Sequence, residues 1–167
     1  MRRFLVGLLG CAVVLTVGAG CGGSSAHSSA VCQPAFQEKL DSRSTEHLFP
    51  GAPEPKYLTE PPTSGPHQLG PPFTGAVTTP IPLPKQVAML ESGYVLVQYQ
   101  GLAAARVSQL VPLAGNLVTV APAAATMPDR VVATSWTWKL VCPATTPADL
   151  QSIQTFIATH KGHGFTH

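Results

Sequence analysis

The sequence has little charge of either sign. Only 11% of its 167 residues are Asp, Glu, Lys or Arg, against about 25% in ordinary globular proteins. Ten Lys and Arg stand against eight Asp and Glu, and two of the ten are Arg2 and Arg3. This balance offers no basic surface, so we expect no nucleic-acid partner. A hydrophobic share of 44% still supports a core, and the length suits one domain.

Motifs of the common catalytic classes are also missing. The chain has neither a G-x-S-x-G turn nor a C-x-x-C pair. A serine, histidine and carboxylate set can be assembled only from scattered residues, namely Ser64, His67, Glu91, Ser92 and Asp129. Residue types this common produce such a combination by chance. The sequence therefore favours a protein that is not an enzyme, and it assigns no catalytic residue, no metal ligand and no cofactor.

The first residues have the pattern of a lipoprotein signal. Arg2 and Arg3 precede an uncharged run of 17 residues, 4–20, and small residues lead into Cys21 as in a lipobox. The alternative anchor, Cys11, follows an apolar segment of only seven residues. We expect a signal peptide over residues 1–20, a lipid on Cys21 and a domain on the extracytoplasmic face of the cell membrane. An uncleaved membrane anchor is the alternative, and it places the domain on the same side.

Two cysteines remain beyond the anchor. Residues 21–30 are small and polar after Cys21, which is typical of a flexible tether. Cys32 and Cys142 then have only each other as partners, and an exported protein meets an oxidising environment. We predict a disulfide between them, closing a loop of about 110 residues. Two free thiols are the alternative.

The remaining pattern predicts one α+β domain over residues 31–160 with a tail at 161–167. Eleven of the 17 prolines fall in residues 50–84, which we expect to form an extended strap packed on the domain. We expect strands at 93–99, 117–120 and 131–140, and helices at 36–40, 103–111 and from Thr146 to the region of Gly162. The predicted fold is a small sheet of three to four strands, one parallel pair being possible, with the C-terminal helix packed on one face.

Three blocks of the sequence carry a resemblance. They are P-P-T-S-G-P-H at 61–67, V-A-M-L-E-S-G at 87–93 and V-V-A-T-S-W at 131–136. Together they resemble a bacterial family catalogued as domain of unknown function 3105, which implies no activity. Similar proteins have V-H-x-L-E-H-G in the second block, so Ala88 and Ser92 stand where histidines are expected. The resemblance implies that a site of these two histidines with His67 is lost here and that only the scaffold is kept.

Five residues remain as candidates for binding: His67, Glu91, Ser92, Trp136 and Trp138. His67 follows a turn-forming Gly-Pro pair, which favours a structural hydrogen bond over a ligand role. Glu91 is the only acid between residues 61 and 127, and pairing with local backbone donors is favoured over a functional carboxylate. Trp136 and Trp138 would face one side of a strand, which favours core packing, with stacking on a cell-wall sugar as the alternative.

We therefore expect a lipid-anchored extracytoplasmic domain that acts through contacts with an envelope protein or the cell wall. The alternative is an envelope protein that binds copper or zinc. It requires His67 to converge with the histidines of the C-terminal region, His160, His163 and His167.

Overall fold

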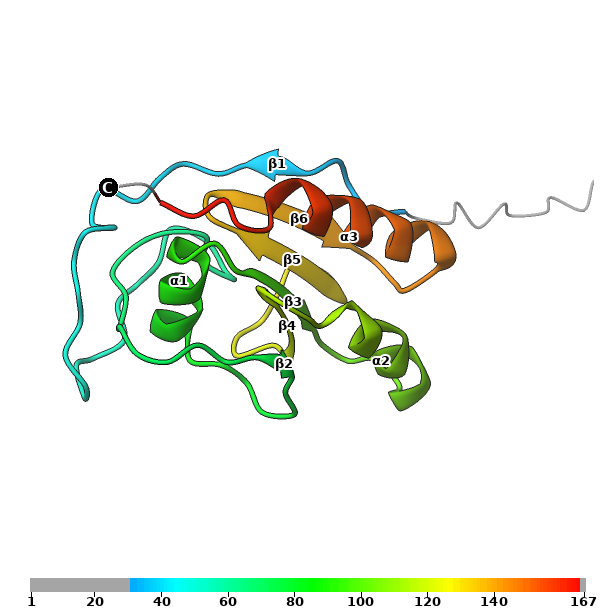
Figure 1. The fold of residues 1–167 in the computed structure, drawn as a ribbon, viewed down its shortest axis with the longest axis horizontal. Coiled ribbons are helices and arrows are strands. Elements are labelled where there is room, and N and C mark those ends of the chain that lie inside the picture. Colours follow the sequence, from blue (N-terminus) through cyan, green and yellow to red (C-terminus); the bar gives the residue numbers. More distant parts are fainter. Residues whose placement is uncertain (1–30, 166–167) are drawn as a thin grey trace, which may run out of the picture.

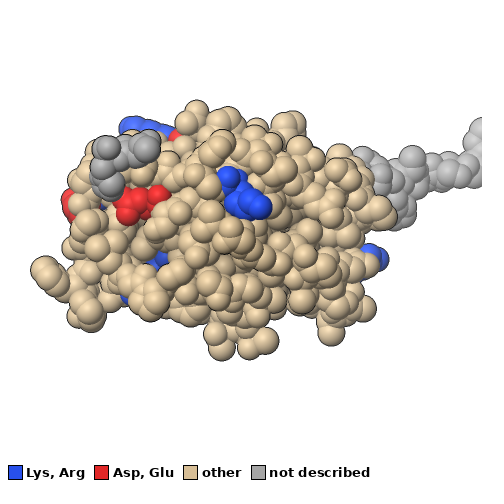
Figure 2. Space-filling model, viewed as in Figure 1, with Lys and Arg blue, Asp and Glu red and all other residues tan. Residues whose placement is uncertain are grey.

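A computed structural model describes residues 31–165 of the chain (Figure 1). The predicted signal peptide, the lipid on Cys21, the tether and His167 lie outside the described residues. Within residues 31–165, no helix has the length and apolar character needed to cross a membrane. Figure 2 shows one face on which charged groups are sparse, as the composition requires.

The described residues build a six-stranded mixed sheet. Its strands are β1 (Phe36–Gln37), β2 (Gly75–Ala76), β3 (Val95–Tyr99), β4 (Val118–Pro122), β5 (Val131–Ser135) and β6 (Trp138–Cys142), in the spatial order β1-β6-β5-β3-β4-β2. Strands β3, β4 and β2 run parallel, while β5, β6 and β1 continue the sheet in antiparallel pairs. The parallel β3–β4 pair confirms that the intervening helix makes a crossover connection.

The fold class is α+β as expected, but the predicted number of strands, three to four, was wrong, because the sheet has six. The predicted strand at 131–140 is a hairpin, because the chain turns at Trp136 and Thr137, where Thr137 has a φ of 59°. Strands β1 and β2 have two residues each, too few for a local pattern to indicate them. The helix expected at 36–40 is also wrong, since Phe36 pairs with Lys139 in the sheet.

Helices cover both faces of this sheet. They are α1 (Leu83–Glu91), α2 (Ala104–Leu110), which continues as a 3-10 turn over Val111–Leu113, and α3 (Pro147–His160). One face carries α2 and α3, whose Leu110, Ile153 and Phe156 pack on alternate strand residues such as Val95 and Val97. The other face carries α1, which was not expected. Its presence corrects the prediction of helices on one face only.

The proline-rich strap packs with α1 on this second face. Tyr57 and Ile81 are buried there with Leu90 of α1 and Leu96 of β3, and the whole segment 61–67 is buried. The strap ends by becoming α1, since Pro84 occupies the first turn, where a proline costs no hydrogen bond. The strap is therefore part of a hydrophobic core cluster.

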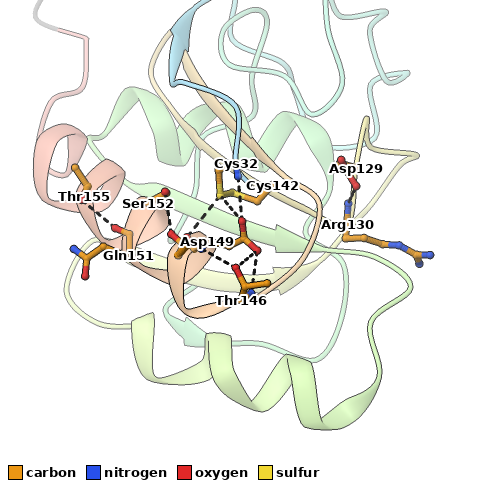
Figure 3. Close-up of a disulfide and its surroundings, with 10 residues drawn as sticks. Cys32, Asp129, Arg130, Cys142, Thr146, Asp149, Gln151, Ser152 and Thr155 are labelled. Atoms are coloured by element: carbon orange, nitrogen blue, oxygen red, sulfur yellow. Dashed lines mark hydrogen bonds between the residues drawn. A yellow bond between two sulfur atoms is a disulfide. The ribbon is translucent and has the colours of Figure 1, made fainter. Parts of the chain in front are cut away.

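The predicted disulfide is present and joins Cys32 to Cys142 at the end of β6 (Figure 3). It lies beside the first turn of α3, where Thr146 Oγ1 accepts a hydrogen bond from the Asp149 amide at 3.2 Å. Asp149 Oδ1 accepts a hydrogen bond from the Cys32 amide at 3.1 Å. The start of the described chain is thereby attached to both β6 and α3.

Candidate metal centre

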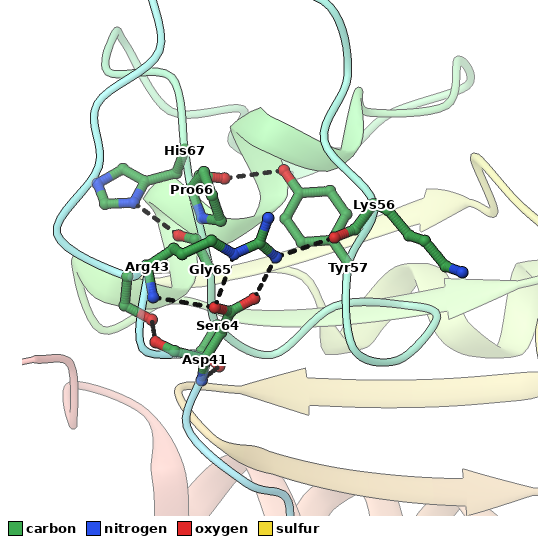
Figure 4. Close-up of polar contacts among 9 residues, drawn as sticks. Asp41, Arg43, Lys56, Tyr57, Ser64, Gly65, Pro66 and His67 are labelled. Carbon is green, nitrogen blue, oxygen red and sulfur yellow. Dashed lines mark hydrogen bonds and ion pairs between the residues drawn. The ribbon is translucent and has the colours of Figure 1, made fainter.

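The segment 61–67 is held by hydrogen bonds that orient His67 (Figure 4). Tyr57 Oη donates to the Pro66 carbonyl at 2.9 Å, and Ser64 Oγ accepts from the Asp41 amide at 2.9 Å. Burial raises the pKa of the Tyr57 phenol, which keeps its donor proton in place. Gly65 has a φ of 129°, and a Cβ there would lie 3.1 Å from the Tyr57 ring. The turn before His67 therefore requires glycine.

Asp41 and Arg43 brace this turn from the preceding loop. Arg43 Nη2 lies 2.7 Å from Asp41 Oδ2, and it also donates to the Lys56 carbonyl at 2.9 Å. The hydrogen bond from the Arg43 side chain holds the pKa of Asp41 below its usual range. Asp41 thus stays ionised beside the 61–67 segment.

His67 is fully buried, and both of its ring nitrogens have polar neighbours. Nδ1 lies 3.1 Å from the Gly65 carbonyl oxygen, and Nε2 lies 2.8 Å from Glu91 Oε2. A carbonyl only accepts, so Nδ1 is the nitrogen that donates here. The other ring nitrogen, Nε2, faces the carboxylate of Glu91. Glu91 reaches it from the last residue of α1, with 11% of its side chain exposed.

His47 completes the cluster from the loop before the strap. The His67 amide donates to the Glu46 carbonyl at 3.0 Å and the Leu48 amide to the His67 carbonyl at 2.7 Å, so the two segments pair as a short parallel bridge. This pairing places the His47 and His67 rings edge to face, with centroids 4.9 Å apart. One ligand atom from each of His47, His67 and Glu91 lies within 4.8 Å of the others.

Two imidazoles and a carboxylate form a ligand set suited to zinc and related divalent ions. The Nδ1 contact of His67 with a backbone carbonyl is the outer contact that usually orients a metal-binding histidine. His47 is exposed, so an ion can reach the cluster from solvent, while His67 anchors it inside the protein. Three protein ligands leave one position of a tetrahedral ion for water or another small ligand.

The structure brings two of the predicted candidate residues together and leaves the serines apart. Glu91 pairs with His67, whereas Ser92 Oγ donates to the Ala88 carbonyl at 3.0 Å and Ser64 Oγ is used by Asp41. Asp129 accepts from the Arg130 amide at an exposed position. The hydrogen bonds of these residues therefore assemble no nucleophile with His67.

The positions of the two replaced histidines line a small cavity, and Ser92 also borders the larger cavity that Glu91 lines. Ala88 and Ser92 line a space of about 50 Å³ together with Gly70 and Lys85, and His67 is not among its lining residues. His47 lies beside His67, and the sequence did not predict this contact. Its distance of 20 residues from His67 (47 to 67) and its lack of a surrounding motif left no local signal.

The two tryptophans do not share a face, which corrects the expectation from a single strand. Trp136 is 8% exposed and packs on Phe165 at 5.6 Å in the α1 cluster. Trp138 packs on His160 at 4.9 Å on the α3 side. The hairpin turn between them separates the indoles, so together they make no stacking platform.

The described C-terminal histidines lie outside the three-residue cluster. His160 packs between Trp138 and Phe156, and burial lowers its pKa. His163 is exposed and borders a cavity that includes Glu91. The metal-binding alternative required His67 to converge with His160 and His163, and within residues 31–165 the ligand cluster of His67 contains neither of them.

Comparison with known proteins adds one match to this geometry. A family model described as "Protein of unknown function (DUF3105)" matches residues 53–166. That range contains His67 and Glu91, while His47 precedes it. No curated protein and no solved structure matches the chain.

Proposed function

We propose that this chain, which belongs to the DUF3105 family, binds a divalent zinc or copper ion through His47, His67 and Glu91. The observation that carries the proposal is the meeting of three ligand atoms within 4.8 Å around a fully buried imidazole. This proposal takes the place of the inference, drawn from the resemblance, that only a scaffold remains.

The distances in the cluster are close to those that a metal ion requires, although the shortest one is that of a direct ion pair. Ligand atoms around a tetrahedral zinc ion with bonds of about 2.0–2.2 Å lie roughly 3.3–3.5 Å from one another. The cluster spans from 2.8 Å, between His67 Nε2 and Glu91 Oε2, to at most 4.8 Å. Metal binding would require His67 Nε2 and Glu91 Oε2 to move apart by roughly 0.5 Å and the most distant pair of ligand atoms to come closer together. With Nδ1 of His67 used as a donor, a metal ion between Nε2 and the carboxylate would replace the proton that a direct hydrogen bond there requires.

We further propose that this domain is lipid-anchored at Cys21 on the extracytoplasmic face of the membrane. The arginine pair, the apolar run and the small residues before Cys21 support this placement. The Cys32–Cys142 disulfide supports it as well, because such bonds persist in oxidising compartments. In this proposal the protein contacts the membrane through the lipid on Cys21. Contacts with an envelope protein or the cell wall, through a domain that is not an enzyme, belong to the same proposal.

Metal binding is tested on the full chain purified in detergent without a histidine tag. Zinc and copper affinities are measured by competition with a chelating dye for the wild type and for His47→Ala. His47 is exposed, so its loss removes a ligand at little cost in stability. We expect the dissociation constant to rise at least about tenfold.

Glu46→Gln is the matched control, because it removes the neighbouring exposed carboxylate, which is not in the cluster. Its affinity should equal that of the wild type. Zinc and copper affinities that are equal in the wild type and His47→Ala would reject the site, and so would a wild type that binds neither ion. In that case His67 and Glu91 form a structural ion pair only.

A further inference from the structure

The C-terminal segment, residues 162–165, lies across the end of the helix that carries Glu91. The Gly162 amide donates to the Gly93 carbonyl at 2.8 Å, and the Phe165 amide donates to the Glu91 carbonyl at 3.0 Å. The Phe165 ring packs on Trp136, which secures the segment to the core. Two backbone hydrogen bonds thus connect the segment to residues 91–93, and one aromatic contact connects it to Trp136.

The two backbones approach so closely that side chains are excluded between them. A Cβ on Gly164 would overlap the Glu91 carbonyl oxygen and lie 2.7 Å from the Gly93 nitrogen. A Cβ on Gly93 would lie 3.0 Å from the Gly162 carbonyl carbon, and Gly93 also has a φ of 83°. Glycine on both sides is therefore what allows this contact.

We infer that the C-terminal segment is a positioning element of the metal site, which it serves by holding the backbone of Glu91. This inference rests on the proposed function. Glu91 is the last residue of α1, and helix ends fray unless other groups hold them. A metal ligand must be held to within about 0.5 Å of its bonding position. The hydrogen bond from Phe165 to the Glu91 carbonyl supplies that restraint from outside the helix.

The same segment also shapes the space next to the ligand. Glu91 and Ser92 line a cavity of about 580 Å³ together with residues 162–165. Displacing the segment would widen this cavity and remove the hydrogen bond that the Glu91 carbonyl accepts from Phe165. The carboxylate would then sample several positions relative to His67, and metal affinity would fall while most of the core stayed unchanged.

Gly164→Ala tests the inference in the full chain. The added methyl group forces the segment away from Glu91, so we expect the zinc dissociation constant to rise about tenfold or more. The metal-free Tm should change by no more than about 5 °C. In the Co²⁺-loaded protein, the visible absorption bands should change in position and intensity, which indicates an altered carboxylate ligand. Gly115→Ala is the control, because its Cβ meets nothing within 4 Å.

A chain that ends at Lys161 is the second variant, since it removes the segment without creating an overlap. If Gly164→Ala lowers the metal-free Tm by more than about 5 °C, the zinc affinity of the shortened chain decides whether the segment positions Glu91. Wild-type zinc affinity in the shortened chain would overturn the inference and leave the proposed function standing. A wild type that binds no zinc would reject both. Loss of affinity in Gly164→Ala and in the shortened chain, with Gly115→Ala unaffected, would support the positioning role.

Discussion

Removal of the disulfide should cost this domain a large part of its stability. Cys32 and Cys142 are 110 residues apart, so the bond closes most of the described chain into one loop. The loop-entropy relation for that length gives about 4–5 kcal/mol at 25 °C. A folded domain has a total stability of roughly 5–15 kcal/mol, so the Cys32→Ala/Cys142→Ala chain should be only marginally folded.

The disulfide lies at the end of the segment, residues 32–38, that pairs with the β5–β6 hairpin. Outside the two residues of β1, backbone hydrogen bonds join this segment to the β5–β6 hairpin, from the Gln33 amide to the Val141 carbonyl at 2.9 Å and from the Glu38 amide to the Thr137 carbonyl at 2.8 Å. The Glu38 carboxylate also pairs with Lys139 of β6. Cys142 is fully buried in the main core cluster, so its sulfur also contributes packing. Without the bond, the first residues can detach and expose the edge of β6.

Guanidinium unfolding of the oxidised wild type and the double variant, both free of metal, measures this difference. We expect a loss of about 4–5 kcal/mol and a Tm lower by roughly 10–20 °C. Wild type reduced with dithiothreitol should behave like the variant. A difference below about 1.5 kcal/mol would refute the reasoning, because it would mean that the loop restricts the unfolded chain far less than its length implies.

Two other predictions concern buried ionisable groups. Burial against Trp138 and Phe156 holds the pKa of His160 below its ordinary value of 6.5, so between those two pKa values the unfolded chain binds more protons than the folded chain. Stability should therefore fall as the pH drops below about 6.5, and urea unfolding of His160→Phe should show a smaller fall. Equal pH dependence in both proteins would contradict this. Lys139 Nζ lies 2.8 Å from Glu38 Oε1 and only 3% of its side chain is exposed, so Lys139→Met should cost about 3–5 kcal/mol by leaving the carboxylate without its cation. The double variant Lys139→Met/Glu38→Gln should recover much of that loss in the same assay, and a single variant as stable as the wild type would exclude the pairing.

Local signals in the sequence were enough for several features of this protein. Thr146 and Pro147 mark the start of α3 because capping and the first helical turn depend on adjacent residues. The run that forms β3 has its own branched and aromatic composition. The disulfide followed from counting, since two cysteines beyond Cys21 had no other partners.

Only the tertiary structure decided the rest of the sheet and the candidate site. Two-residue strands such as β1 and β2 exist because a neighbouring strand pairs with them, and their own residues carry no such pattern. His47, His67 and Glu91 are separated by 20 and 24 residues (47 to 67, 67 to 91), and they meet because a backbone bridge and the end of α1 converge. Distances between segments this far apart are set by packing of the whole chain. A single sequence contains the residues of the cluster but not their convergence.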